Sequence, residues 1–130
     1  MKKLIFFSFL IIILTACEKQ GAVAPLDGTY AGTFSIVVND KEQVSDFEVV
    51  LNAKRFRTTK GIGGQGPFEV LGNNKIKFTD ENVYTANFNW AILLSGTYNY
   101  EIKGDRLILT KILENPVKGN YYQYKLKKIN

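Results

Sequence analysis

The sequence predicts an all-β fold: a single antiparallel up-and-down barrel, or a strongly curved sheet, of seven to eight short strands. Three observations support this prediction. From residue 27 onward, apolar side chains recur at every second position, which is typical of half-buried strands. Turns rich in glycine, asparagine and aspartate separate these segments at short, regular intervals. No segment has the periodicity of an amphipathic helix longer than two turns.

The expected strands follow one another along the chain with short connections. They are residues 28–38, 43–53, 54–60, 67–71, 75–80, 97–103, 106–113 and 121–129. The clearest hairpin turns at Gly104–Asp105, because a two-residue Gly-Xaa loop suits the type II′ geometry that twisted strands prefer. Strands joined by tight turns pair antiparallel, and a meander of eight strands can remove its edges by closing into a barrel.

The first sixteen residues have the pattern of a secretory signal peptide. Lys2 and Lys3 supply positive charge, residues 4–14 form an apolar stretch, and two small residues follow. This stretch is too short to cross a bilayer, which takes about 20 apolar residues. We therefore expect residues 1–16 to be removed on export.

Cys17 is the only cysteine of the chain. A disulfide within the chain would need a second cysteine, and an activated thiolate would need a base such as histidine, which the chain lacks. The sequence Leu14-Thr15-Ala16-Cys17 resembles the lipobox of bacterial lipoproteins. The resemblance implies that Cys17 is lipidated, and that the mature protein is exported and anchored to the cell envelope, at the outer membrane.

Residues 17–26 lack periodicity and contain Gly21 and Pro25, so we expect a flexible tether followed by a β-barrel domain over residues 27–130. The segments GTYAGTF, KIKFTD, LLSGTYNYEIKGDRLILTK and YYQYKLKK resemble the small lipocalin-like lipoproteins of Gram-negative envelopes. This resemblance implies a calycin-type barrel carried on the tether. Tyr30 stands where lipocalins proper carry the tryptophan of a G-x-W motif.

Charge gives little indication of a partner. Once residues 1–16 are removed the formal charge falls to about +3, and we expect no nucleic-acid partner for an exported chain with so diffuse a charge. Lys125, Lys127 and Lys128 form a small basic cluster near the C-terminus. We interpret them as lysines that protect an edge strand. Contact with anionic lipid headgroups is the alternative.

The segment GIGGQG, residues 61–66, matches the dinucleotide-binding pattern G-x-G-x-x-G. In such sites the glycines lie between a strand and a helix whose N-terminus holds the pyrophosphate. Here Gly66 precedes a short strand and a turn, so we interpret the segment as a flexible loop and expect no cofactor.

The chain has few side chains suited to catalysis. Without histidine or a second thiol, it cannot form Ser-His-Asp, Cys-His or histidine-rich zinc sites. Asp80 and Glu81 are adjacent and would point to opposite faces of a strand, while Asp46 and Glu48 share a face that we expect to meet solvent. We therefore expect no catalytic residue, no metal site and no enzyme.

Aromatic residues are the most abundant candidates for ligand contacts. Barrels of about eight strands either fill with side chains or hold one small ligand. For an apolar ligand in the interior, the candidate contacts are Phe88, Trp90, Tyr98, Tyr100, Tyr122 and Tyr124. The alternative, which we favour, is that these side chains fill the interior.

The sequence thus favours a binding module for a small apolar ligand or a partner protein. An envelope inhibitor of a lysozyme-like hydrolase is an alternative, because residues 95–109 loosely resemble the hairpin of envelope lysozyme inhibitors. That resemblance implies that Ser95 and Lys103 enter the enzyme cleft. A structural envelope protein without a ligand is the third possibility.

Overall fold

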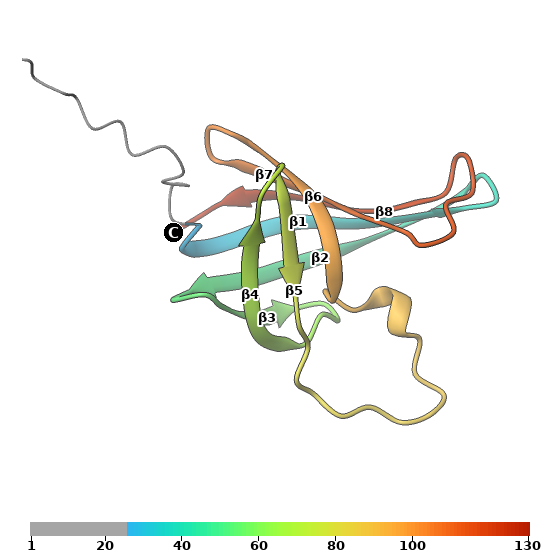
Figure 1. Ribbon diagram of the computed structural model, residues 1–130, viewed down its shortest axis with the longest axis horizontal. Coiled ribbons are helices and arrows are strands. Elements are labelled where there is room, and N and C mark those ends of the chain that lie inside the picture. Colours follow the sequence, from blue (N-terminus) through green and yellow to red (C-terminus); the bar gives the residue numbers. More distant parts are fainter. Residues whose placement is uncertain (1–25) are drawn as a thin grey trace, which may run out of the picture.

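A computed structural model describes residues 26–130, which form a closed antiparallel barrel of eight strands (Figure 1). The fold class is as the sequence predicts. The strands are β1 (Gly28–Val38), β2 (Lys41–Asn52), β3 (Arg55–Lys60), β4 (Gln65–Leu71), β5 (Lys75–Phe78), β6 (Gly96–Lys103), β7 (Arg106–Lys111) and β8 (Tyr121–Lys128). The signal peptide, Cys17 and all of the expected tether except Leu26 lie outside the described residues.

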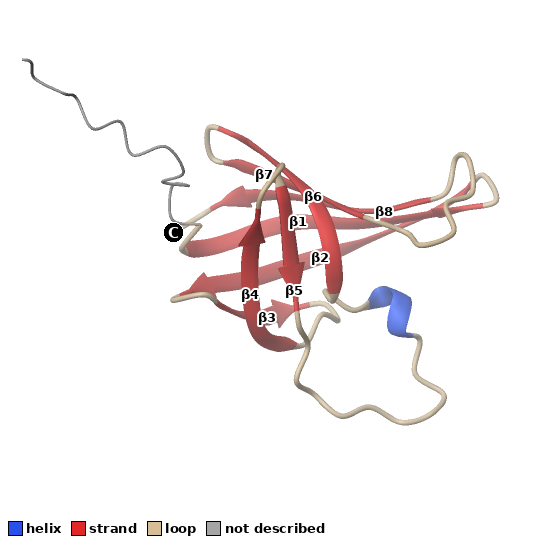
Figure 2. Ribbon diagram, in the orientation of Figure 1, coloured by secondary structure: helices blue, strands red, loops and turns tan. Residues whose placement is uncertain are grey.

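A single turn of 3₁₀ helix, η1 (Trp90–Ile92), interrupts the long connection between β5 and β6 (Figure 2). Within residues 26–130, no helix has the length and apolarity needed to cross a bilayer.

Each strand pairs with its neighbours in sequence, and β8 pairs with β1 to close the barrel. The β1–β8 register runs from Tyr30 opposite Lys128 to Val37 opposite Tyr121. Since β8 also pairs with β7, it is not an edge strand. Our interpretation of the lysines of β8 as edge protection is therefore wrong.

Successive connections alternate between the two ends of the barrel. We call one end the turn end; it carries the short connections 53–54, 72–74 and 104–105 together with both termini of the described chain. The other, the loop end, carries connections 39–40, 61–64, 79–95 and 112–120. In Figure 1 the turn end lies to the left and top, and the loop end to the right and bottom.

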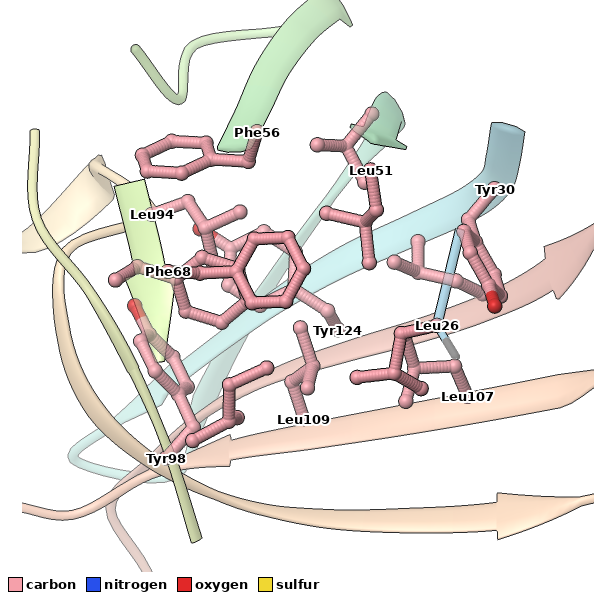
Figure 3. Packing of buried hydrophobic residues seen from close by; sticks show 14 of the residues in the cluster. Leu26, Tyr30, Leu51, Phe56, Phe68, Leu94, Tyr98, Leu107, Leu109 and Tyr124 are labelled. Atoms are coloured by element: carbon pink, nitrogen blue, oxygen red, sulfur yellow. The ribbon is translucent and has the colours of Figure 1, made fainter. Parts of the chain in front are cut away.

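Side chains from alternate strand positions fill the interior (Figure 3). Tyr124 lies at the centre, with its ring stacked on that of Phe34 at 4.2 Å and 4.6 Å from that of Phe47. The other members of this cluster are Leu26, Tyr30, Val49, Leu51, Phe56, Phe68, Ile76, Phe78, Leu94, Tyr98, Leu107, Leu109 and Leu126. The strands of residues 26–130 thus enclose a continuous hydrophobic core.

Leu26 departs from the expected boundary of the tether. It is 5% exposed and joins the core cluster at the turn end, beside Tyr30 and Leu107 in Figure 3. Burying a leucine side chain is worth about 2 kcal/mol. The first described residue thus fastens the chain to the barrel at this end.

Candidate functional site

Two of the six aromatic residues proposed as ligand contacts belong to the core. Tyr98 and Tyr124 are at most 1% exposed, and their ring centroids lie 5.9 Å apart. The hydroxyl of Tyr98 donates a hydrogen bond to the carbonyl oxygen of Leu93 at 3.2 Å. Burial raises the pKa of both phenols well above their ordinary value. Both therefore stay protonated at neutral pH, and their rings occupy the space that an internal ligand would need.

Tyr100 and Tyr122 are partly buried and pack against the outside of this cluster. The Nζ of Lys111 lies 6.0 Å from the centre of the Tyr122 ring, within the range of a cation–π contact. Burial lowers the pKa of this ammonium group. Tyr122 thus lies between the filled interior and the loop end.

Phe88 and Trp90 lie outside the barrel, in connection 79–95. Their rings form a cluster with that of Tyr84, which stacks on Phe88 at 4.4 Å and meets Trp90 edge-on at 5.3 Å. Trp90 is 56% exposed. The structure therefore separates the six candidates: Tyr98 and Tyr124 meet in the core, and Phe88 and Trp90 meet on the loop end.

The β1–β2 hairpin extends past the rest of the barrel at the loop end. Strand β3 pairs with β2 only over Glu48–Asn52. Nearer the hairpin tip, residues 41–47 of β2 pair with β1 on one side and with no strand of the described chain on the other. The Asn39–Asp40 turn holds this hairpin, with φ of 52° and 61°, as in a type I′ turn. The extension gives the loop end one open wall.

Two adjoining grooves lie beneath this extension. The first, of about 460 Å³, is lined by Phe34, Ile36, Gln43, Val44, Ser45, Phe47, Gly61, Ile62 and Ile92. The second, of about 400 Å³, is lined by Ile36, Val38, Asn39, Lys41, Gln43, Asn89, Ile92 and Tyr122. Ile36, Gln43 and Ile92 belong to both. Ligand pockets in proteins typically measure 300–1,000 Å³ and combine apolar walls with a few polar groups, as these grooves do.

At the loop end, residues 64–66 pack tightly against residues 79–80. A Cβ at Gly64 would collide with the carboxylate of Asp80, and one at Gly66 with the carbonyl oxygen of Thr79. Asp80 Oδ1 accepts hydrogen bonds from the backbone N–H groups of Gln65 at 3.3 Å and Asn82 at 3.1 Å. The glycines of residues 61–66 thus allow this segment to lie close to the start of connection 79–95. The residues directly after Gly66 continue strand β4 and form no helix.

Ser95 and Lys103 lie at opposite ends of the barrel. Ser95 directly precedes β6 at the loop end, whereas Lys103 ends β6 at the turn end, where its Nζ lies 3.0 Å from Glu101 Oε1. Eight residues of extended strand span roughly 26 Å. These two residues do not form one local cluster.

No group of three or more aspartate, glutamate, histidine or cysteine side chains within residues 26–130 is placed to hold a metal ion. Comparison of the chain with protein-family models, curated proteins and solved structures gives no match. We therefore infer a function from the geometry of the loop end.

Proposed function

We propose that the protein is a lipid-anchored binding module of the cell envelope, which holds an apolar group of a ligand or partner in the grooves of the loop end. One observation carries this proposal. The interior is filled with side chains, whereas Ile36, Ile62 and Ile92 line open grooves beside it. Burial of an apolar group against these side chains is favourable by about 25 cal/mol per Å² of apolar surface removed from water.

The position of the chain terminus supports a defined orientation of the module. Leu26 enters the barrel at the turn end, and the ten residues from Cys17 to Leu26 reach at most roughly 30 Å. A lipid on Cys17 would keep the turn end near the membrane and direct the loop end away from it. Lys103, Arg106 and Lys127 lie side by side on β6, β7 and β8 at the turn end. Glu101 and Asp105 lie within 4 Å of the two lysine Nζ atoms, at 3.0 and 3.7 Å, so Arg106 is the member of this row that most favours an anionic surface.

We propose binding rather than catalysis. The most deeply buried titratable side chains of residues 26–130 are the phenols of Tyr98 and Tyr124, and burial raises the pKa of both. A general base must be deprotonated and within reach of the reacting group. Neither phenol meets these conditions.

Trp90 provides a direct test of the grooves. It begins η1, whose last residue, Ile92, lines both grooves. Titration of residues 26–130 with dodecanoate and with small aromatic compounds should shift the solvent-exposed emission of Trp90 to shorter wavelength in a saturable manner. The variant Ile92→Asp should abolish the shift.

The matched control is Val83→Asp, which adds the same charge to the same connection at a residue that is 97% exposed. This variant should bind like the unmodified protein. An emission that ignores every compound, or equal loss of binding in both variants, would rule out the grooves as the site.

A further inference from the structure

The open wall of the loop end has unpaired backbone groups as well as an apolar groove. The edge concerned is residues Lys41–Ser45 of β2, because the close approach of Gly61 to Asp46 and Phe47 covers the next residues. All five residues are exposed. Unpaired strand edges are sites at which another strand can add.

The pairing with β1 identifies the backbone groups that remain available. Val38 and Lys41 flank the two-residue turn and form the first pair of the β1–β2 ladder. In an antiparallel ladder, alternate residues direct their N–H and C=O groups to opposite sides. Lys41, Gln43 and Ser45 therefore face β1, and the backbone groups of Glu42 and Val44 face the open side.

The side chains of this edge differ between its two faces. Gln43 and Ser45 point inward and line the larger groove, together with Ile62 and Ile92. Glu42 and Asp46 lie on the outer face, and Val44 between them is 57% exposed. Asp46 Oδ2 lies 3.3 Å from the Nζ of Lys60, so Glu42 is the carboxylate of this edge that has no cation beside it among the described residues. An added strand would place side chains alternately over the apolar groove and beside these carboxylates.

We propose that an extended protein segment with alternating apolar and basic residues binds by adding a strand to the Lys41–Ser45 edge of β2. Its apolar side chains enter the groove, and its basic side chains lie beside Glu42. This inference rests on the proposed function, since it names the partner of the same groove.

One register of self-pairing is unfavourable at this edge. Antiparallel pairing of two copies about Val44 would place Glu42 of each copy opposite Asp46 of the other. Like charges directly opposite on neighbouring strands are destabilising. Glu42 therefore disfavours this register and favours a partner with basic side chains.

The test uses residues 26–130 and a synthetic peptide of alternating lysine and valine, seven residues long and blocked at both ends. Binding is measured by fluorescence anisotropy of the labelled peptide, and amide hydrogen exchange is followed by NMR. We expect the amides of Glu42 and Val44 to become protected, while those of Gln43 and Ser45, already bonded to β1, change little. A peptide with glutamate in place of lysine should bind at least tenfold more weakly.

Two variants separate strand addition from groove binding. Val44→Pro removes the outward N–H on an edge strand, where proline is tolerated, and should weaken peptide binding about tenfold. The control Val83→Pro makes the same substitution at a 97% exposed residue outside both grooves and should bind like the unmodified protein. Ile62→Asp should weaken binding by placing a charge in the groove.

Three results would overturn the inference. Binding that Ile62→Asp weakens and Val44→Pro leaves unchanged would exclude strand addition and retain the apolar groove of the proposed function. If the unmodified protein binds no peptide and its Trp90 emission does not respond to dodecanoate, both strand addition and the proposed groove binding are excluded. Concentration-dependent dimerisation that protects Glu42 and Val44 without peptide would assign the edge to a second copy.

Discussion

The two ends of the barrel are joined by the same strands but built in different ways. At the turn end, connections of two or three residues close the hairpins, and Leu26 fills the opening. At the loop end, connections 61–64 and 79–95 and the overhanging β1–β2 hairpin line open apolar grooves. Binding residues are commonly carried by loops on a rigid scaffold. The contrast places the core in the interior and the turn end, and our proposal places binding at the loop end.

The charges of the two ends differ as well. Lys103, Arg106 and Lys127 lie in a row at the turn end, with Glu101 and Asp105 beside the two lysines. Glu42 and Asp46 lie on the outer face of the exposed hairpin, with Lys60 beside Asp46. We propose that the two ends bind different partners: an anionic surface near the chain terminus, and a basic segment at the hairpin.

The largest expected effect comes from truncating the central aromatic residue. Tyr124→Ala removes a ring that contacts Phe34, Phe47 and Tyr98, and should lower the free energy of unfolding by about 3–5 kcal/mol. Trp90→Ala at the loop end should cost less than about 1 kcal/mol, because Trp90 is largely exposed. Urea unfolding followed by circular dichroism measures both, and equal losses would contradict the division between the core and the loop end.

A second pair of variants concerns the residue that closes the turn end. Leu26→Ala should lower the free energy of unfolding by about 2–4 kcal/mol, since the leucine is buried in the core cluster. Val83→Ala, in the exposed connection of the loop end, should change it by less than about 0.5 kcal/mol. The same urea unfolding assay applies. A Leu26→Ala variant as stable as the unmodified protein would show that this residue belongs to the tether.

The buried phenols predict a loss of stability at alkaline pH. Above pH of about 10, tyrosines of the unfolded chain release protons, whereas Tyr98 and Tyr124 stay protonated in the barrel because burial raises their pKa. The folded state then binds more protons than the unfolded state, so stability falls as pH rises, by up to about 1.4 kcal/mol per pH unit for each residue.

The double variant Tyr98→Phe with Tyr124→Phe should show a shallower decline between about pH 10 and 11.5 in thermal unfolding. At neutral pH, Tyr98→Phe alone should cost about 1 kcal/mol through its lost hydrogen bond to Leu93. If the stability of the double variant falls as steeply with pH as that of the unmodified protein, the decline does not arise from Tyr98 and Tyr124.

The smallest effect concerns the turn between β2 and β3. Ala53 and Lys54 have φ of 49° and 62°, a left-handed conformation that favours glycine. Lys54→Gly should raise the free energy of unfolding by about 0.5–1 kcal/mol. Lys54→Ala keeps the unfavourable conformation and is the control, expected to change little. Urea unfolding distinguishes them, and equal stabilities would show that this turn holds no strain.

Most of the fold could be predicted from the sequence because period-two alternation marks each strand. The hairpin at Gly104–Asp105 is confirmed by the pairing of Lys103 with Arg106. The turn at Ala53–Lys54 could not be predicted, since neither residue type favours a positive φ. Here the hydrogen bonding of the flanking strands overrides local preference.

Less of the candidate site could be predicted. Ile36, Ile62 and Ile92 come from three separate segments, and no spacing in the sequence joins them. The open edge of β2 depends on where β3 stops pairing, a matter of register that alternation does not fix. Trp90 lies in a stretch that breaks strict alternation, and this break marks a connection outside the barrel wall.

The glycine-rich segment shows the same limit. The absence of a helix after Gly66 is as expected, but Gln65 and Gly66 belong to β4 and are not part of a loop. Their close approach to Thr79 and Asp80 is a tertiary contact that the local pattern does not encode.

Whether the loop end binds ligand while the interior stays closed can be tested by mapping amide chemical-shift changes on residues 26–130 during titration with dodecanoate. We predict shifts confined to the loop end, at Gln43, Ile62 and Ile92, with Tyr98 and Tyr124 unchanged. Shifts centred on Tyr98 and Tyr124 would place the ligand inside the barrel and contradict the filled core.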